Sequence, residues 1–172
     1  ASARLREMGY TPQVVIVGPI FDRQRGYHRR LMALTHELGL HGVHFVGNRA
    51  DVRPVLARID IYVCSSIAES SPVSVWEAMA MARPVVSTDV GDVARHVEDG
   101  KSGFIVPIGD SGVMADRIVE LLEDADLRTR MGEAARRAAH CFSPQVIADA
   151  TLAFYREVAS MPARRAASGS DI

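Results

Sequence analysis

Short apolar runs along this chain alternate with longer segments in which apolar residues recur at helical spacing. Residues 13–17 form a β-branched run that Gly18-Pro19 ends at once, which is typical of a strand buried on both faces of a parallel sheet. Strands that alternate with helices indicate an α/β fold, a Rossmann-like, doubly wound parallel sheet flanked by helices. Ligands of such sheets bind at the carboxyl ends of the strands. Four more strands are predicted, over residues 43–46, 60–65, 84–88 and 103–106.

The chain beyond Asp110 is predicted to be helical. Apolar spacing indicates one helix that ends near residue 122 and a second over residues 127–139. Ser143-Pro144 supplies the N-cap and the first-position proline that open a last helix. Residues 162–172 are small, polar and basic without periodicity, so we expect a disordered tail after one domain over residues 1–161.

Bulk properties exclude several classes of protein. The 172 residues carry a formal net charge of −1, so no nucleic-acid partner is indicated. No run approaches the roughly 18 apolar residues of a membrane span and no secretory signal is recognisable, so we expect a cytoplasmic protein. The histidines show no metal-ligand grouping, so neither a metal nor a cofactor is expected. Cys64 and Cys141 lie among apolar neighbours and are expected to be buried, reduced thiols.

The most informative stretch runs from Glu69 to Glu77. Ser71 is a good N-cap and Pro72 suits the first helical position, so a helix is predicted to open at Pro72. The free N–H groups at residues 73–75 would then form an anion site at the helix end. Side chains on a helix lean toward its N-terminus, so the two carboxylates would flank that site and could accept hydrogen bonds from sugar diols.

The spacing of these two glutamates, followed by Ala-Met-Ala, resembles the signature of retaining glycosyltransferases of the two-domain GT-B architecture, family 4 or group 1 type. The resemblance continues through further segments, at residues 83–88, Gly91, 97–107 and 130–136. It implies that this chain is the C-terminal, donor-nucleotide-binding domain of such an enzyme. The implied reaction transfers a sugar from a nucleoside diphosphate sugar to an acceptor hydroxyl, without a metal and with the anomeric configuration retained.

The resemblance also assigns roles to individual residues. Glu77 would hold the ribose hydroxyls, and Glu69 would contact the donor sugar near the reacting centre as the catalytic position. The turn between them would approach the diphosphate and the sugar, and the loops after the first two strands would complete the donor site. These remaining donor-binding positions are Ser71, Pro72, Val73, Ser74, Val75, Gly18, Gly47, Asn48 and Arg49.

Parts of the family pattern are missing or altered. The N-terminal acceptor domain, the first strand and the Arg and Lys that follow it are not in this sequence, so we expect the chain alone to be inactive. The missing acceptor domain is the expected partner, and peripheral contact of the full-length protein with a membrane stays open. Ala82 stands where the family commonly has Gly, which would strain the backbone if that position needs a positive φ. Asp92 and Arg95 replace a second Gly and a Glu.

Two other classes of function remain as alternatives. A nucleotide-sugar epimerase of the same fold would bind a similar ligand, but the two motif glutamates argue against it. A non-catalytic nucleotide-sugar-binding module would be favoured by loss of these glutamates, and both are intact. A dinucleotide oxidoreductase is disfavoured because no G-x-G-x-x-G follows a predicted strand.

Overall fold

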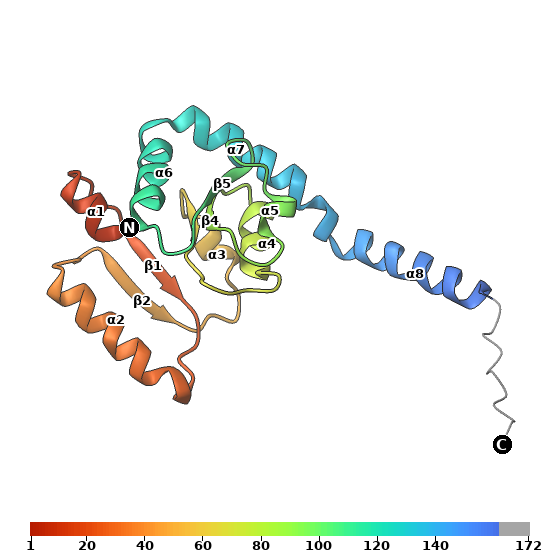
Figure 1. Ribbon diagram of the computed structural model, residues 1–172, viewed down its shortest axis with the longest axis horizontal. Helices are drawn as coiled ribbons and strands as arrows, with labels where there is room; N and C mark the ends of the chain where they lie inside the picture. Colours follow the sequence, from red (N-terminus) through yellow and green to blue (C-terminus); the bar gives the residue numbers. More distant parts are fainter. Residues whose placement is uncertain (162–172) are drawn as a thin grey trace, which may run out of the picture. The chain divides into compact units, whose positions relative to one another are not determined.

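The computed structural model describes residues 1–161 and divides into two compact units, residues 1–139 and residues 140–172. Figure 1 shows the elements along the chain. None of the described helices is both long enough and apolar enough to cross a membrane. The predicted disordered tail, residues 162–172, lies outside the described residues. In chain order the elements are α1 (Ser2–Glu7), β1 (Val14–Val17), η1 (Asp22–Gln24), α2 (Arg25–Glu37), β2 (Val43–Gly47), α3 (Arg53–Leu56), β3 (Tyr62–Cys64), α4 (Val73–Ala80), β4 (Val85–Thr88), α5 (Val93–His96), β5 (Gly103–Val106), α6 (Ser111–Glu123), α7 (Ala125–Ala138), η2 (Ala139–Phe142) and α8 (Pro144–Ser160).

All five strands pair in parallel, as the alternation of strands and helices predicts. They form two sheets, with the orders β1-β2 and β3-β4-β5, where a single sheet was expected. The predicted class, an α/β fold with parallel strands, is therefore confirmed. The expected single sheet is interrupted, because β1 and β3 do not pair with each other. Five predicted strands correspond to five observed ones, and their ends differ by a few residues at most.

The core of the first unit lies around the three-stranded sheet. Val86, Phe104 and Val106 point to one face of this sheet and pack with Leu5 of α1 and with buried side chains of α6 and α7. All four residues of β4 are buried, so this strand has the two covered faces of a central parallel strand. The helix α4 packs on β3 and β4, and three of its side chains are fully buried: Val75, Ala78 and Met79.

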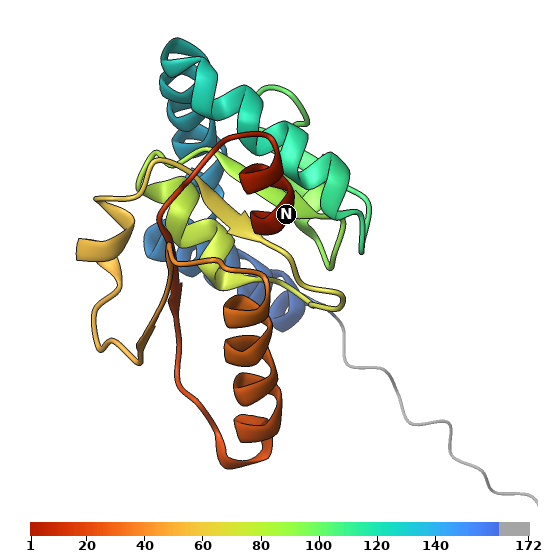
Figure 2. The same ribbon diagram turned by 90° about the vertical axis from the view of Figure 1, so that its left-hand side faces the viewer.

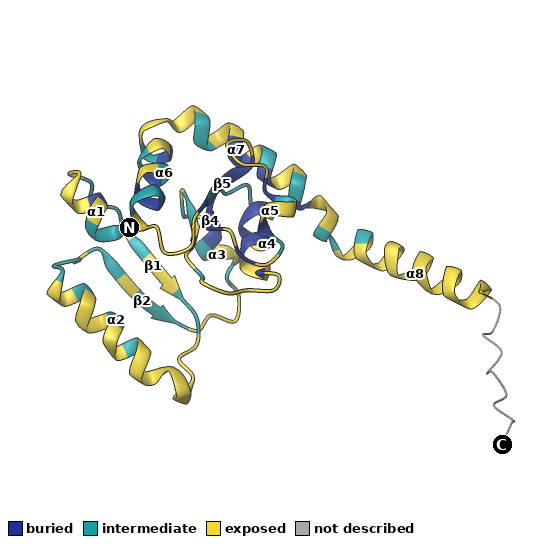
Figure 3. Ribbon diagram, viewed as in Figure 1, coloured by how far each residue is buried: buried dark blue, intermediate teal, exposed yellow. Residues whose placement is uncertain are grey.

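The two-stranded sheet is much less covered (Figure 3). The helix α2 runs along it in both ribbon views (Figures 1 and 2), and His28 of α2 meets Phe45 of β2 edge to face at 5.1 Å. The side chains of Val15 and Ile16 are nevertheless 40% and 41% exposed. The expectation that this strand is buried on both faces is therefore wrong, because β1 pairs with β2 alone among the described strands.

The turn after α4 contains the strain that the sequence suggested. Ala82 has φ +55°, and it is the one residue other than glycine with a positive φ among the described residues. This backbone region costs an L-residue with a Cβ roughly 1–2 kcal/mol.

The helix α7 packs closely against the same turn. A Cβ added to Gly132 of α7 would lie 2.3 Å from the carbonyl oxygen of Ala82, so α7 can approach this turn closely only with glycine at position 132.

The second unit consists of the end of η2 and the long helix α8. Ser143 caps this helix through a hydrogen bond that its Oγ accepts from the N–H of Val146 at 3.4 Å, and Pro144 is its first residue, as predicted. No residue of α8 is buried, and several large apolar side chains on it are more than half exposed: Ile147, Leu152, Phe154 and Tyr155.

The two cysteines differ: Cys64 is buried as expected, whereas Cys141 in η2 is exposed, so the prediction for Cys141 is wrong.

Candidate functional site

The helix of the glutamate motif begins one residue later than predicted. Its first residue is Val73, and Pro72 is the N-cap, with extended backbone angles of φ −75° and ψ 93°. No side chain caps this helix among the described residues. Ser71 is not the N-cap, because its Oγ accepts a hydrogen bond from the indole N–H of Trp76 at 3.1 Å. Trp76 is buried, and a buried indole N–H usually has a hydrogen-bond partner such as this one.

The first turn of α4 retains free backbone donors. The N–H of Val75 donates to the carbonyl oxygen of Pro72 at 2.9 Å, so this predicted anion-binding amide is already used. The N–H groups of Val73 and Ser74 have no acceptor among the described residues. Both residues are exposed, and the positive end of the helix dipole lies behind them. The anion site therefore rests on two amides, where the sequence predicted three.

Tyr62 is a member of this site that the sequence analysis missed. Its phenol donates a hydrogen bond to the Oγ of Ser74 at 2.7 Å, which joins β3 to the first turn of α4. Burial raises the pKa of Tyr62 above its ordinary value, and the carboxylates of Glu77 and Glu69 add to the rise. The charges of both motif glutamates thus act on one phenol, which itself bonds to the first turn of α4.

The loop that carries Glu69 is held from two sides. An Oε1 atom of Glu69 accepts a hydrogen bond from Ser66 Oγ at 2.8 Å, so the carboxylate is fixed against its own loop. The N–H of Asp92 donates to the carbonyl oxygen of Ser70 at 3.1 Å. Gly91, with φ +57°, packs so closely that an added Cβ would lie 2.3 Å from that same oxygen. Glycine is therefore required at this turn. The turn after β4 packs against the backbone of the loop that carries Glu69 and fixes its position.

Two of the three residues that depart from the family pattern, Asp92 and Arg95, follow Gly91 at the start of α5 and within it. Asp92 has φ −102°, so the position needs no glycine. Its Oδ1 is buried and has no hydrogen-bond partner among the described residues, while its Oδ2 lies 3.8 Å from His96 Nε2. The replacement is thus tolerated by the backbone but leaves one buried carboxylate oxygen unsatisfied, which is costly.

The loops after β1 and β2 form a separate group. The N–H of Gly18 donates to the carbonyl oxygen of Gly47 at 3.1 Å, so these two predicted positions do meet at the carboxyl ends of their strands. Gly47 has φ +70°, which favours glycine. Asn48 and Arg49 follow it and are exposed. Gly18 and Gly47 end the strands of the two-stranded sheet, whereas Glu69 and Glu77 follow β3 of the three-stranded sheet, so the predicted positions fall into two sets, one for each sheet.

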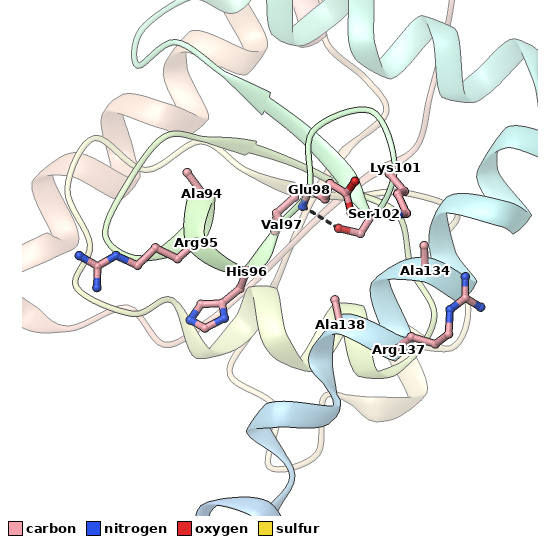
Figure 4. A pocket seen from close by; sticks show the side chains of 10 residues that line it. All are labelled: Ala94, Arg95, His96, Val97, Glu98, Lys101, Ser102, Ala134, Arg137 and Ala138. Atoms are coloured by element: carbon pink, nitrogen blue, oxygen red, sulfur yellow. Dashed lines mark hydrogen bonds and ion pairs between the residues drawn. The ribbon is translucent and has the colours of Figure 1, made fainter.

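Two surface hollows lie away from the glutamates. One, of about 450 Å³, is lined by Ile20, Arg25, His28 and Arg29. The other, of about 500 Å³, lies between α5, the loop after it and α7, and includes Arg95 (Figure 4). Neither contains a residue of the glutamate motif. Within residues 1–161 no group of three His, Cys, Asp or Glu side chains could hold a metal ion.

Comparison with known proteins identifies glycosyltransferases among the relatives of this chain. The lipopolysaccharide core biosynthesis glycosyltransferase LpsE of Rhizobium meliloti is 37% identical over 124 residues, which are 71% of this chain and 36% of that protein. The phosphatidyl-myo-inositol mannosyltransferase of Mycobacterium leprae is 33% identical over 151 residues, or 86% of this chain and 38% of that protein. The chain spans about a third of the length of these curated relatives.

A solved structure shows the same fold with a ligand. Anabaena Alr3699/HepE in complex with UDP superposes with a TM-score of 0.79 and 28% identity, over 86% of this chain and 42% of that chain. A family model described as "Glycosyl transferases group 1" matches residues 1–124. With that match over more than two thirds of its length and relatives above 30% identity, the chain belongs to the group 1 glycosyl transferases, which have the GT-B fold.

Proposed function

We propose that this chain is the donor-nucleotide-binding domain of a glycosyltransferase that uses a nucleoside diphosphate sugar. The observation that carries the proposal is that Glu69 and Glu77 both act on the phenol of Tyr62, which bonds to the first turn of α4. The amides of Val73 and Ser74 suit the diphosphate, and the Glu77 carboxylate suits the ribose diol. Supporting this, the structural neighbour from Anabaena was solved with UDP.

The reaction we propose transfers the sugar to an acceptor hydroxyl with retention of the anomeric configuration. The bond between the anomeric carbon and the diphosphate oxygen breaks, and its electron pair leaves with the diphosphate. The acceptor oxygen bonds to the same face of that carbon, and its proton passes to the departing diphosphate oxygen. Donors at the helix end stabilise the charge on the leaving group without a metal, and Glu69 contacts the donor sugar. Activity that EDTA leaves unchanged and a product with the donor's configuration, read by NMR, are the expected results.

Binding tests the role of the glutamates most directly. A panel of nucleoside diphosphates and their sugars is titrated into the domain and into the full-length protein, with backbone amide shifts read by NMR. Saturable shifts of the residue 73–77 amides that favour one base are expected, and Glu77→Ala should weaken binding at least tenfold. Glu133→Ala, an exposed helix glutamate on α7, is the matched control and should bind as the unchanged protein does. Equal affinity of the two variants, or no binding by the full-length protein, would refute the proposal.

We also propose that a strand from the N-terminal part of a longer protein lies between β1 and β3. Val14 donates its N–H to Gly42 in the direction of β2, so the alternating N–H groups of Val15 and Val17 point to the opposite edge. Tyr62 donates to Pro84 beside β4, so the N–H of Val63 points away from β4. Neither of these edges pairs with another strand among the described residues.

The path of α1 supports this placement. Its Leu5 is buried in the core of the three-stranded sheet, yet the next strand, β1, belongs to the other sheet. A strand that precedes α1 would make a strand–helix–strand crossover and would pair in parallel beside β1. The exposed apolar side chains of Val15, Ile16 and Val63 are those that such a strand and its neighbours would cover.

Hydrogen exchange tests the strand. In this chain alone the amides of Val15, Val17 and Val63 should exchange quickly, and in the full-length protein they should be protected. The amides of Val14 and Tyr62, which already donate within the sheets, serve as internal controls and should be protected in both. Equally fast exchange of the three edge amides in the full-length protein would exclude the strand.

The remaining parts of the proposal concern the whole protein. We propose that it contains an N-terminal acceptor domain that closes over the donor and excludes water, so this chain alone should transfer no sugar. We place the reaction in the cytoplasm, where nucleotide sugars are made. The lipid-linked acceptors named for some relatives make the membrane surface a plausible site for the full-length enzyme, which co-sedimentation with vesicles would test.

A further inference from the structure

The hydrogen bond between Tyr62 and Ser74 has a consequence for the ligand. A serine hydroxyl has one hydrogen to donate and two lone pairs that accept. The Oγ of Ser74 accepts from the phenol of Tyr62 at 2.7 Å, and no acceptor for the hydroxyl hydrogen of Ser74 exists among the described residues. The bond therefore leaves that hydrogen for a group outside the protein.

The position of Ser74 decides which group this is. Ser74 is the second residue of α4 and is exposed, so its hydroxyl and its N–H both belong to the open end of the helix. Glu77 lies three residues further on, which puts the two side chains next to each other on the helix surface. A ligand whose diol meets Glu77 and whose diphosphate meets the helix end would pass beside Ser74.

We propose that Tyr62 is a positioning residue that fixes the Ser74 hydroxyl as a donor to the diphosphate of the ligand. This inference rests on the proposed function, and it adds to the helix-end amides a side-chain donor that the glutamate signature does not contain. The phenol is suited to this task because Tyr62 is half-buried and belongs to β3, so the bond to Ser74 ties a strand of the sheet to the first turn of α4. Since burial raises the pKa of Tyr62, its phenol keeps the proton that it donates at neutral pH.

The test compares single and double variants of the full-length protein, with UDP as the probe and uridine as the ligand without phosphate. Tyr62→Phe and Ser74→Ala should each weaken UDP binding about five- to tenfold, the loss of one hydrogen bond to a charged group, and leave uridine binding unchanged. The double variant should be no weaker than Ser74→Ala, because Tyr62 acts through that hydroxyl. Ser74→Thr keeps the hydroxyl and should bind UDP normally. Tyr27→Phe, an exposed tyrosine on α2, is the matched control.

The outcomes separate this inference from the proposed function. If Glu77→Ala weakens UDP binding but Ser74→Ala does not, the positioning role is wrong and the donor site stands. Losses from Tyr62→Phe and Ser74→Ala that add in the double variant would also overturn it, since the two side chains would then act independently. If the full-length protein does not bind UDP, or if Glu77→Ala leaves UDP binding unchanged, both the proposed donor site and the positioning role of Tyr62 are refuted. Ser74 is exposed, so its alanine variant folds and keeps the test decisive even where Tyr62→Phe lowers stability.

Discussion

The strand β1 is more apolar than β4, yet β1 is the more exposed of the two. Val-Val-Ile-Val in β1 leaves its two central side chains about 40% exposed, whereas every residue of Val-Val-Ser-Thr in β4 is buried. The difference comes from their neighbours. A strand on each side and packed helices enclose β4, while β1 pairs with β2 alone among the described strands. Burial in a parallel sheet is thus a property of the completed sheet more than of one strand's sequence.

The contrast extends to function. The three-stranded sheet carries Tyr62, the Glu69 loop and α4, all of which rest on a buried core. The two-stranded sheet carries Gly18, Gly47, Asn48 and Arg49, and no residue of its two strands is buried. We therefore expect substitutions in the first part to affect folding and the glutamate site together, and equivalent substitutions in the second part to have small effects in this chain.

The largest difference is expected between two glycines in helices. Gly132→Ala would put a Cβ 2.3 Å from the backbone oxygen of Ala82 and should destabilise the fold by about 3 kcal/mol. Gly26→Ala in α2 meets open space and should stabilise the fold slightly, by about 0.5–1 kcal/mol, because alanine favours the helix. Urea unfolding of both variants is the measurement. Similar stabilities would show that α7 does not press on the turn after α4.

Two valines extend the comparison to the strands themselves. Val86→Ala removes methyl groups from a fully buried site and should lower the free energy of unfolding by about 2 kcal/mol. Val15→Ala should lower it by less than about 0.5 kcal/mol in this chain, since the side chain is largely exposed. In the full-length protein the effect of Val15→Ala should grow if a further strand covers that edge. An effect of Val15→Ala that stays small in both would weaken the case for that strand.

The sequence predicted most of the fold because its signals are local. Short β-branched runs, two of them ended by glycine, and helical periodicity were sufficient for all five described strands and for the parallel pairing. The division into two sheets was not predictable, because edge pairing depends on strands far away in the sequence. The start of α4 was predicted one residue early. The Ser71 hydroxyl oxygen accepts its hydrogen bond from the indole N–H of Trp76 and does not cap a backbone N–H of the helix.

The candidate site was predictable only in part. The spacing of Glu69 and Glu77 indicated two carboxylates at one helix end, and both of them contribute to the raised pKa of Tyr62. Tyr62 itself was missed because it lies within an apolar strand, where a tyrosine is expected as a core residue. Its role depends on the crossing of β3 and α4, which no local pattern specifies. The loop contact between Gly18 and Gly47 followed from the predicted topology.

Ala82 offers a smaller test, in the turn that joins α4 to the buried strand. Ala82→Gly should raise the free energy of unfolding by about 1 kcal/mol, because glycine adopts φ +55° without the strain of a Cβ. The gain is reduced by the greater freedom of glycine in the unfolded chain. Ala80→Gly, two residues earlier and still inside the helix, is the control and should lower stability by about 1 kcal/mol. A destabilised Ala82→Gly variant would mean that packing outweighs backbone strain at this turn.

The smallest effect we expect is a dependence on alkaline pH. The ordinary pKa of tyrosine is 10.0, and burial raises that of Tyr62 in the folded state. The unfolded chain therefore loses its proton first as the pH rises, so the stabilising contribution is present below pH 10 and is lost above it. Unfolding free energy measured on both sides of pH 10 should fall less steeply in Tyr62→Phe than in the unchanged chain. The Tyr10 pKa is raised too, chiefly by its hydrogen bond with Glu123, so Tyr10→Phe must be measured alongside. Equal slopes for Tyr62→Phe and the unchanged chain would mean that the phenol at the glutamate site is more open to water than the buried sheet around it suggests.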